Sequence, residues 1–152
     1  MIFDISPPVL YDFGLVSAID WLLDNVREQH GIRTNLENDG RPKPMEEDIR
    51  VTLFQVAREL IMNAVKHSEA ESLDVSIRRD DGNIVIGIED DGIGFDTSEI
   101  EQLKLKNKGF GLFNIKERLK LLGGKVEIES EPGRGTCVTV AAPLNIGRRE
   151  RD

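Results

Sequence analysis

The segment IEDDGIGFD, residues 88–96, places two carboxylates and two glycines directly after an apolar, strand-like run. An ionised carboxylate only accepts hydrogen bonds, so Asp90 is suited to receive an exocyclic amino group such as adenine N6. Gly92 and Gly94 would let the backbone approach a flat base without side-chain obstruction. A plain turn stays open as the alternative, whereas an EF-hand loop does not fit, because the spacing of its oxygen ligands and its closing glutamate are missing. The same DDG tripeptide at residues 80–82 lies between two strand-like runs and is predicted to be an ordinary hairpin turn.

A polar stripe lies on the most clearly predicted helix, residues 46–67. At about 100° per residue, the stripe lies beside the apolar face and contains Glu59, Asn63, Lys66 and His67. Asn63 offers the hard oxygen that magnesium prefers, and Lys66 and His67 could neutralise phosphate charge. A solvated helix face with stabilising charge pairs is the alternative that these residues leave open.

Two glycine motifs follow. In KGFGLFNIKERL, Gly109 and Gly111 precede a predicted helix, where backbone N–H groups and the helix dipole form a site for phosphate. In EPGRGT, glycines form a tight turn before a strand, and Thr136 offers a hydroxyl group. The plainer alternatives are a helix entry without a ligand and a simple hairpin. A Rossmann fingerprint is excluded because the third glycine is missing, and a P-loop is excluded because no GxxxxGK[ST] occurs.

The elements that must position these residues alternate between helical and strand patterns. Apolar spacing predicts helices over residues 15–30, 46–67 and 109–122. Alternation predicts strands within residues 32–39, 73–77, 83–90, 125–130 and 136–143. The order helix, strand, helix, two strands, helix, two strands indicates an α+β fold, with helices on one face of a mixed sheet.

Composition narrows the functional classes. At 152 residues the chain is the size of one domain, and its net charge of −8 argues against a nucleic-acid partner. An anionic ligand would need local dipoles or a metal to overcome that charge. The single Cys137 permits no internal disulfide, and cysteine spacing offers no zinc site. No apolar run approaches the roughly 18 residues of a membrane span and no signal peptide opens the chain. We therefore expect a cytoplasmic segment that is not membrane-embedded, whether or not its parent protein is anchored.

Taken in order, the motifs ExxxNxxKH, DxGxG, GxGL and GxGT resemble the N, G1, G2 and G3 boxes of the histidine-kinase ATPase domain. That domain is part of a wider superfamily that includes the gyrase, heat-shock chaperone and mismatch-repair ATPases. The match covers about residues 32–144, and FQVARELIMNAVKHSEA and GFGLFNIKERLKLLGG resemble the branch related to nitrate sensors. The resemblance implies a two-layer α/β sandwich, the Bergerat ATP-binding fold. It also implies a connector and first helix over residues 1–30, after a dimerisation region, an ATPase domain over 31–144, and a polar tail over 145–152.

The resemblance further implies a role for each motif residue. Asn63 matches the magnesium ligand of the N box and Glu59 its acidic partner, while Lys66 and His67 lie near the phosphates. The residues implied in nucleotide binding are Asp90, Gly92, Gly94, Lys108, Gly109, Phe110, Gly111, Leu112 and Thr136. The polar stretch over residues 96–108 would be the ATP lid.

The implied activity is transfer of a phosphoryl group from ATP to a protein histidine in two-component signalling, with ATP and Mg²⁺ as cofactors. Its expected partners are the dimerisation and histidine-phosphotransfer domain of the same parent protein and, indirectly, a response regulator. His30 and His67 lie outside any acceptor motif, so we expect an isolated catalytic domain that cannot phosphorylate itself alone. The alternatives are an ATP-hydrolysing machine of the gyrase or chaperone type, where Glu59 would activate water, and an anti-sigma-type serine kinase.

Overall fold

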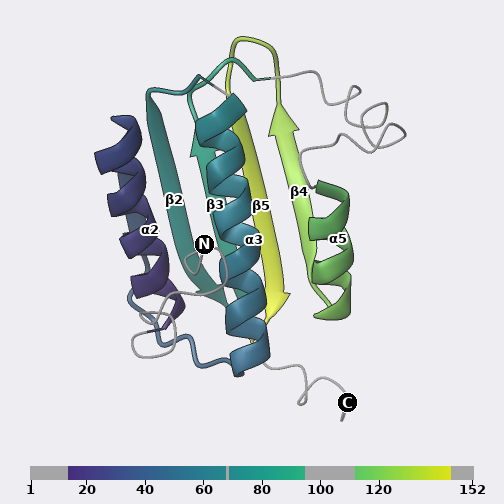
Figure 1. The fold of residues 1–152 in the computed structure, drawn as a ribbon. Helices are drawn as coiled ribbons and strands as arrows, with labels where there is room; N and C mark the ends of the chain where they lie inside the picture. Colours follow the sequence, from purple (N-terminus) through teal and green to yellow (C-terminus); the bar gives the residue numbers. More distant parts are fainter. Residues whose placement is uncertain (1–13, 68, 95–111, 145–152) are drawn as a thin grey trace.

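The computed structural model of the chain describes residues 14–67, 69–94 and 112–144 (Figure 1). Within these residues the elements are α2 (Leu15–His30), β1 (Arg33–Asn38), α3 (Glu47–His67), β2 (Ser72–Asp80), β3 (Asn83–Asp90), α5 (Leu112–Leu121), β4 (Lys125–Ser130) and β5 (Thr136–Pro143). This is the predicted order of helices and strands. The predicted start of the third helix at Gly109 lies outside the described residues.

The strands form one mixed sheet in the order β1-β2-β3-β5-β4. β1 pairs with β2 in parallel, and the other neighbours pair antiparallel. Figure 1 shows the helices on one face of this sheet, with α3 across its middle and α5 beside β4. The predicted α+β two-layer sandwich is therefore confirmed, and the DDG at residues 80–82 is the turn of the β2–β3 hairpin.

Strand periodicity decides which side chains of β3 meet the helices. Ile84, Ile86 and Ile88 are each at most 3% exposed and belong to the core that includes Phe54 of α3. Residues two apart on a strand share a face, so the next residue in this series is Asp90. The sequence thus carries a carboxylate onto the helix-facing side of the sheet, at the end of β3.

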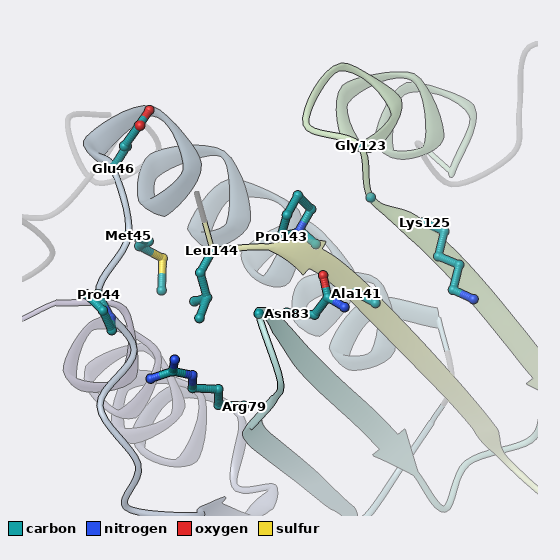
Figure 2. Close-up of a pocket in the computed structure, with 13 residues that line it drawn as sticks. Pro44, Met45, Glu46, Arg79, Asn83, Gly123, Lys125, Ala141, Pro143 and Leu144 are labelled. Carbon is teal, nitrogen blue, oxygen red and sulfur yellow. The ribbon is translucent and has the colours of Figure 1, made fainter. Parts of the chain in front are cut away.

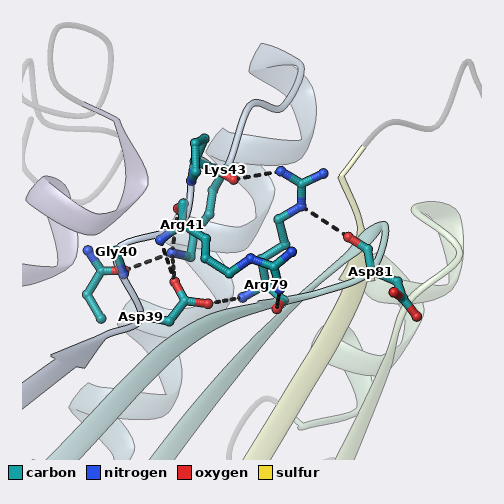
Figure 3. A network of polar contacts seen from close by, with 8 residues as sticks. Asp39, Gly40, Arg41, Lys43, Arg79 and Asp81 are labelled. Carbon is teal, nitrogen blue, oxygen red and sulfur yellow. Dashed lines mark hydrogen bonds and ion pairs between the residues drawn. The ribbon is translucent and has the colours of Figure 1, made fainter.

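A polar cluster fixes the loop between β1 and α3 onto the end of β2 (Figure 3). The carboxylate of Asp39 accepts hydrogen bonds from the Lys43 ammonium and from the backbone N–H groups of Arg79, at 2.7 Å, and Arg41, at 3.0 Å. The Lys43 side chain is only 6% exposed, and its ammonium also donates to the Asn38 side-chain oxygen at 2.7 Å. The loop therefore holds a buried cation whose charge is balanced locally.

This cluster predicts a pH-dependent contribution to stability. The Lys43 ammonium, together with the backbone N–H of Arg79, holds the pKa of Asp39 well below its usual range. Because folding lowers this pKa, the contribution of Asp39 is complete above the unfolded-state pKa of about 4 and is lost as the pH falls below it. We expect Asp39→Asn to lower the thermal unfolding midpoint at pH 7, and the difference from wild type to shrink steadily below about pH 4.

Circular-dichroism melts between pH 7 and pH 2.5 would measure both effects. The matched control is Asp24→Asn, which removes an exposed carboxylate that pairs with Arg27 at 3.1 Å and is 54% exposed. Its effect should be smaller at every pH, because exposed pairs contribute little. A difference between Asp39→Asn and wild type that stays constant over the whole pH range would contradict the assigned origin.

Candidate functional site

The end of β3 places a carboxylate where packing alone would favour an apolar side chain. Asp90 is 6% exposed, and no other acidic residue that the structure describes is buried. Its Oδ1 accepts the backbone N–H of Gly92 at 2.9 Å. Burying a charged group is costly unless it is hydrogen-bonded, and such groups concentrate at functional sites. Asp90 is therefore the strongest single indication of a binding site in the described part of the chain.

The surroundings of Asp90 only partly stabilise its ionised form. Burial raises the pKa of the Asp90 carboxyl, and the charges of Asp91 and Glu89 raise it further. The backbone N–H groups of Gly92 and Thr136 lower it in part. A hydrogen-bond donor on a ligand would add to this stabilisation of the ionised form, so the carboxylate is prepared to receive an amino group.

The adjacent carboxylate has a structural role that the sequence did not reveal. Asp91 Oδ1 accepts the backbone N–H groups of Glu71 at 2.8 Å and Ser72 at 3.0 Å. The Ser72 N–H is the main cause that lowers the pKa of Asp91. These bonds tie the end of β3 to the start of β2. The two acids of this DDG thus differ in function, because one braces the strand end and the other faces the site.

The loop after Asp90 packs tightly against the β4–β5 turn. Gly94 has a φ of 65°, and a Cβ atom there would collide with the backbone oxygen of Glu131. Gly135 has a φ of 80°, and its Cβ would collide with the backbone oxygen of Asp90. Both glycines are needed for this close approach. The DxGxG and GxGT motifs, about 40 residues apart in sequence, are therefore in direct backbone contact.

The chain offers a matched pair of substitutions that tests this close approach. Gly133 and Gly135 have nearly equal φ values, 81° and 80°, but Gly133 has no heavy atom within 4 Å of an added Cβ. Gly133→Ala should cost about 1–2 kcal/mol from backbone strain alone. Gly135→Ala should cost a further ~1–3 kcal/mol, because the added methyl group overpacks the site. Urea unfolding would measure both losses of stability. Equal losses would show that the loop after Asp90 and the β4–β5 turn do not need to be in contact.

Hydroxyl groups complete the side of the site formed by β4 and β5. Thr136 is the cross-strand partner of Asp90, and its Oγ1 lies 2.8 Å from Ser130 Oγ. Ser130 donates its single hydroxyl proton to the Gly135 carbonyl at 3.0 Å. Thr136 must therefore donate to Ser130, which leaves lone pairs of Thr136 as acceptors. The structure brings the predicted residues Asp90, Thr136 and the two glycines of DxGxG together.

Cavity volume alone does not identify the site. A hollow of about 500 Å³ includes Asp90 and Thr136 and is large enough for a small-molecule ligand. A larger one, about 920 Å³, lies at the other end of β3, where Asn83, Arg79 and Leu144 line it (Figure 2). No predicted site residue lines this larger cavity. The buried carboxylate, rather than the volume, distinguishes the two ends.

The polar stripe of α3 lies at the same end of the molecule as Asp90. α3 packs against β3 and α5, and Figure 1 shows its C-terminal end beside the end of β3. Glu59 and Asn63 are partly buried, Lys66 is exposed, and the side chain of His67 lies outside the described residues. Glu59 Oε2 lies 4.0 Å from Nη1 of Arg118 in α5, a partner that sequence reasoning missed. The sequence alone could not single out Arg118, because α5 also contains Lys116 and Lys120.

The predicted glycine-rich phosphate site falls on residues that the structure does not describe. Lys108, Gly109, Phe110 and Gly111 lie outside the described residues, as does the expected lid over residues 96–108. Leu112 opens α5, but its side chain is likewise not described. Among the described residues, no helix has the length and apolar composition needed to cross a membrane.

The mixed sheet and its single helical layer define a domain of the α+β class, and the buried carboxylate at the end of a central strand marks its candidate ligand site. Residues 48–146 match the family model described as histidine kinase-, DNA gyrase B-, and HSP90-like ATPase, and the chain belongs to this family.

Three histidine kinases are similar in sequence to nearly the whole of this chain. The chain is 35% identical to an uncharacterized sensor-like histidine kinase of Chloroflexus aurantiacus, with 95% of this chain and 25% of that protein covered. It is 34% identical to the signal transduction histidine-protein kinase/phosphatase DegS of Bacillus subtilis, with 92% and 37% covered. The oxygen sensor histidine kinase NreB of Staphylococcus carnosus is 29% identical, with 93% and 40% covered. The chain thus spans about a quarter to two fifths of the length of these relatives.

Solved structures agree on the fold. The nucleotide-free catalytic domain of the histidine kinase ThkA superposes with a TM-score of 0.72 at 18% identity, with 89% of this chain and 93% of that chain covered. The histidine kinase AdeS of Acinetobacter baumannii superposes with a TM-score of 0.67 at 22% identity, with 86% and 63% covered.

Proposed function

We propose that this chain is the ATP-binding catalytic domain of a sensor histidine kinase. It transfers the γ-phosphoryl group of Mg-ATP to a histidine on a separate dimerisation domain. The observation that supports this most is Asp90, a buried carboxylate with remaining acceptor capacity at the end of an apolar strand. The family match and the sensor-kinase relatives support the same assignment.

Asp90 accepts the adenine amino group in this proposal. Gly92 and Gly94 lie beside the base, where the backbone is already held by the β4–β5 turn. Thr136 contributes an acceptor oxygen on the opposite strand. A rigid, pre-formed site of this kind loses little conformational entropy on binding.

The polar stripe of α3 would bind the phosphate end of the nucleotide. No three His, Cys, Asp or Glu side chains in the described ranges cluster as a protein-only metal site would require. Magnesium would instead rest on Asn63, on water and on the nucleotide, as this ion commonly does. When bound, it neutralises phosphate charge. Glu59, Lys66 and His67 would lie near this end of the nucleotide, where Lys66 and His67 would neutralise phosphate charge.

The glycine-rich motif, which lies outside the described residues, would supply further phosphate contacts. Backbone amides of Gly109 and Gly111 would bind phosphate oxygens, with the neighbouring motif residues Lys108, Phe110 and Leu112. Positioning and charge neutralisation are the main requirements of phosphoryl transfer, so these groups suffice without a covalent intermediate on this chain.

The phosphoryl acceptor and the later partners belong to the same proposal. We assign the acceptor histidine to the dimerisation domain of the parent protein, and the next transfer to a response regulator on the cytoplasmic side of the membrane. Residues 1–30 would connect to that dimerisation domain, residues 31–144 would form the catalytic unit, and residues 145–152 would form a polar tail.

Two measurements test the proposal. Calorimetry should detect binding of ATP in the presence of Mg²⁺, and radiolabelled ATP should label the parent's dimerisation domain when this chain is added. The label should be stable to alkali and labile to acid, as a phosphohistidine is. Absence of ATP binding would overturn the proposal. Steady-state hydrolysis without transfer, abolished by Glu59→Gln, would favour the gyrase or chaperone type instead.

A further inference from the structure

The side chain that faces Glu59 comes from the helix that follows the glycine-rich segment. Arg118 Nη1 lies 4.0 Å from Glu59 Oε2, with the two side chains 42% and 32% exposed. α5 packs on α3, and Ile115 and Leu119, on either side of Arg118 in sequence, are fully buried. The backbone of α5 is therefore fixed by its apolar face, which keeps the guanidinium close to α3.

Glu59 lies one helical turn before Asn63, so its carboxylate is close to where the proposed magnesium and phosphates bind. An unbalanced carboxylate there would repel the polyphosphate. A guanidinium is always charged and presents its donors in a planar fork, so it can both balance this carboxylate and restrict its orientation.

We propose that Arg118 is a positioning residue that sets the orientation and charge balance of the Glu59 carboxylate for phosphoryl transfer. This inference rests on the proposed function. Arg118 acts through Glu59 and does not itself touch the nucleotide. The pair also connects α5, which begins directly after the glycine-rich motif, with the helix that bears Asn63.

The transfer rate, not the stability, distinguishes a positioning role from a purely structural one. Exposed ion pairs contribute little to stability, so loss of the pair should hardly change the unfolding midpoint in either case. A misplaced catalytic group, in contrast, lowers the rate of the chemical step. The two roles are therefore distinguished when the transfer rate, nucleotide affinity and stability are measured on the same variants.

The first test is the Arg118→Met variant, assayed with radiolabelled Mg-ATP and the parent's dimerisation domain. We expect the transfer rate at saturating ATP to fall about tenfold or more, and the ATP dissociation constant to rise by a smaller factor, about two- to threefold, because the unbalanced Glu59 carboxylate then repels the polyphosphate. Arg118→Lys should recover part of the rate, because it keeps the charge but not the fork. Lys120→Met is the matched control, since it removes an exposed cation two residues further along α5 and should leave the rate unchanged.

A double-mutant cycle decides whether Arg118 acts through Glu59. On a Glu59→Gln background, Arg118→Met should cause no further loss of rate. Independent losses that multiply would overturn the inference, as would an Arg118→Met variant that transfers at the wild-type rate. If Arg118→Met proves unfolded in thermal melts, the same cycle with Arg118→Lys decides between the same two outcomes. A wild-type chain that neither binds nor transfers would instead overturn the proposed function, and the inference with it.

Discussion

Replacing Asp90 with asparagine should weaken ATP binding by about 100-fold, roughly 3 kcal/mol, and leave the fold intact. Asparagine keeps an oxygen that can accept the Gly92 N–H, which Asp90 Oδ1 accepts at 2.9 Å. The other carboxylate oxygen becomes an amino group. That group would face the adenine amino group, so two donors would meet where one acceptor is needed. Sites built to hydrogen-bond a ligand discriminate strongly against such a mismatch.

Calorimetry with Mg-ATP and thermal melts on the same samples would measure the effect. Asp80→Asn is the matched control, because Asp80 opens the other DDG tripeptide, is exposed, and belongs to a hairpin turn. It should change neither affinity nor stability. Asp91→Asn should lower stability more than affinity, since Asp91 braces Glu71 and Ser72. An unchanged dissociation constant for Asp90→Asn would refute the adenine role.

The elements that the sequence predicted best are those whose apolar residues repeat with one period. In β3, Ile84, Ile86 and Ile88 alternate strictly and are all buried. In the long helix, the predicted span of residues 46–67 differs from Glu47–His67 by a single residue. Local pattern is sufficient in these cases, because a one-residue slip of a strand would turn its whole apolar face to solvent.

The parts of the site that could not be predicted depend on contacts between distant segments. Nothing local to Asp91 shows that its carboxylate will brace Glu71 and Ser72, about 20 residues earlier. Likewise, Arg118 meets Glu59 only because α5 packs beside α3. The sequence indicates only that Gly135 belongs to a turn. The structure shows that a side chain at this position would collide with the backbone of Asp90. The motif residues 108–111 stay a prediction, since they lie outside the described part of the chain.

The second large effect is expected at Asn63. Asn63→Asp should lower the rate of magnesium-dependent phosphoryl transfer by about 10- to 100-fold. The amide supplies a neutral oxygen ligand together with an N–H donor, whereas a carboxylate supplies no donor. It would also add a negative charge beside the triphosphate, one helical turn from Glu59. A carboxylate does bind Mg²⁺ more strongly, but at this position its charge would also repel the phosphates of the nucleotide.

The comparison that isolates the metal is ATP affinity with Mg²⁺ and with EDTA. The wild-type chain should bind more tightly when Mg²⁺ is present, and Asn63→Asp should lose most of that gain, whereas in EDTA the added charge should weaken its binding by a smaller factor. Asn35→Asp, an exposed change of the same chemistry on β1, should behave as wild type in both conditions. Equal weakening of Asn63→Asp with and without Mg²⁺ would assign Asn63 to the nucleotide rather than to the ion. Normal transfer by this variant would show that neither role belongs to Asn63.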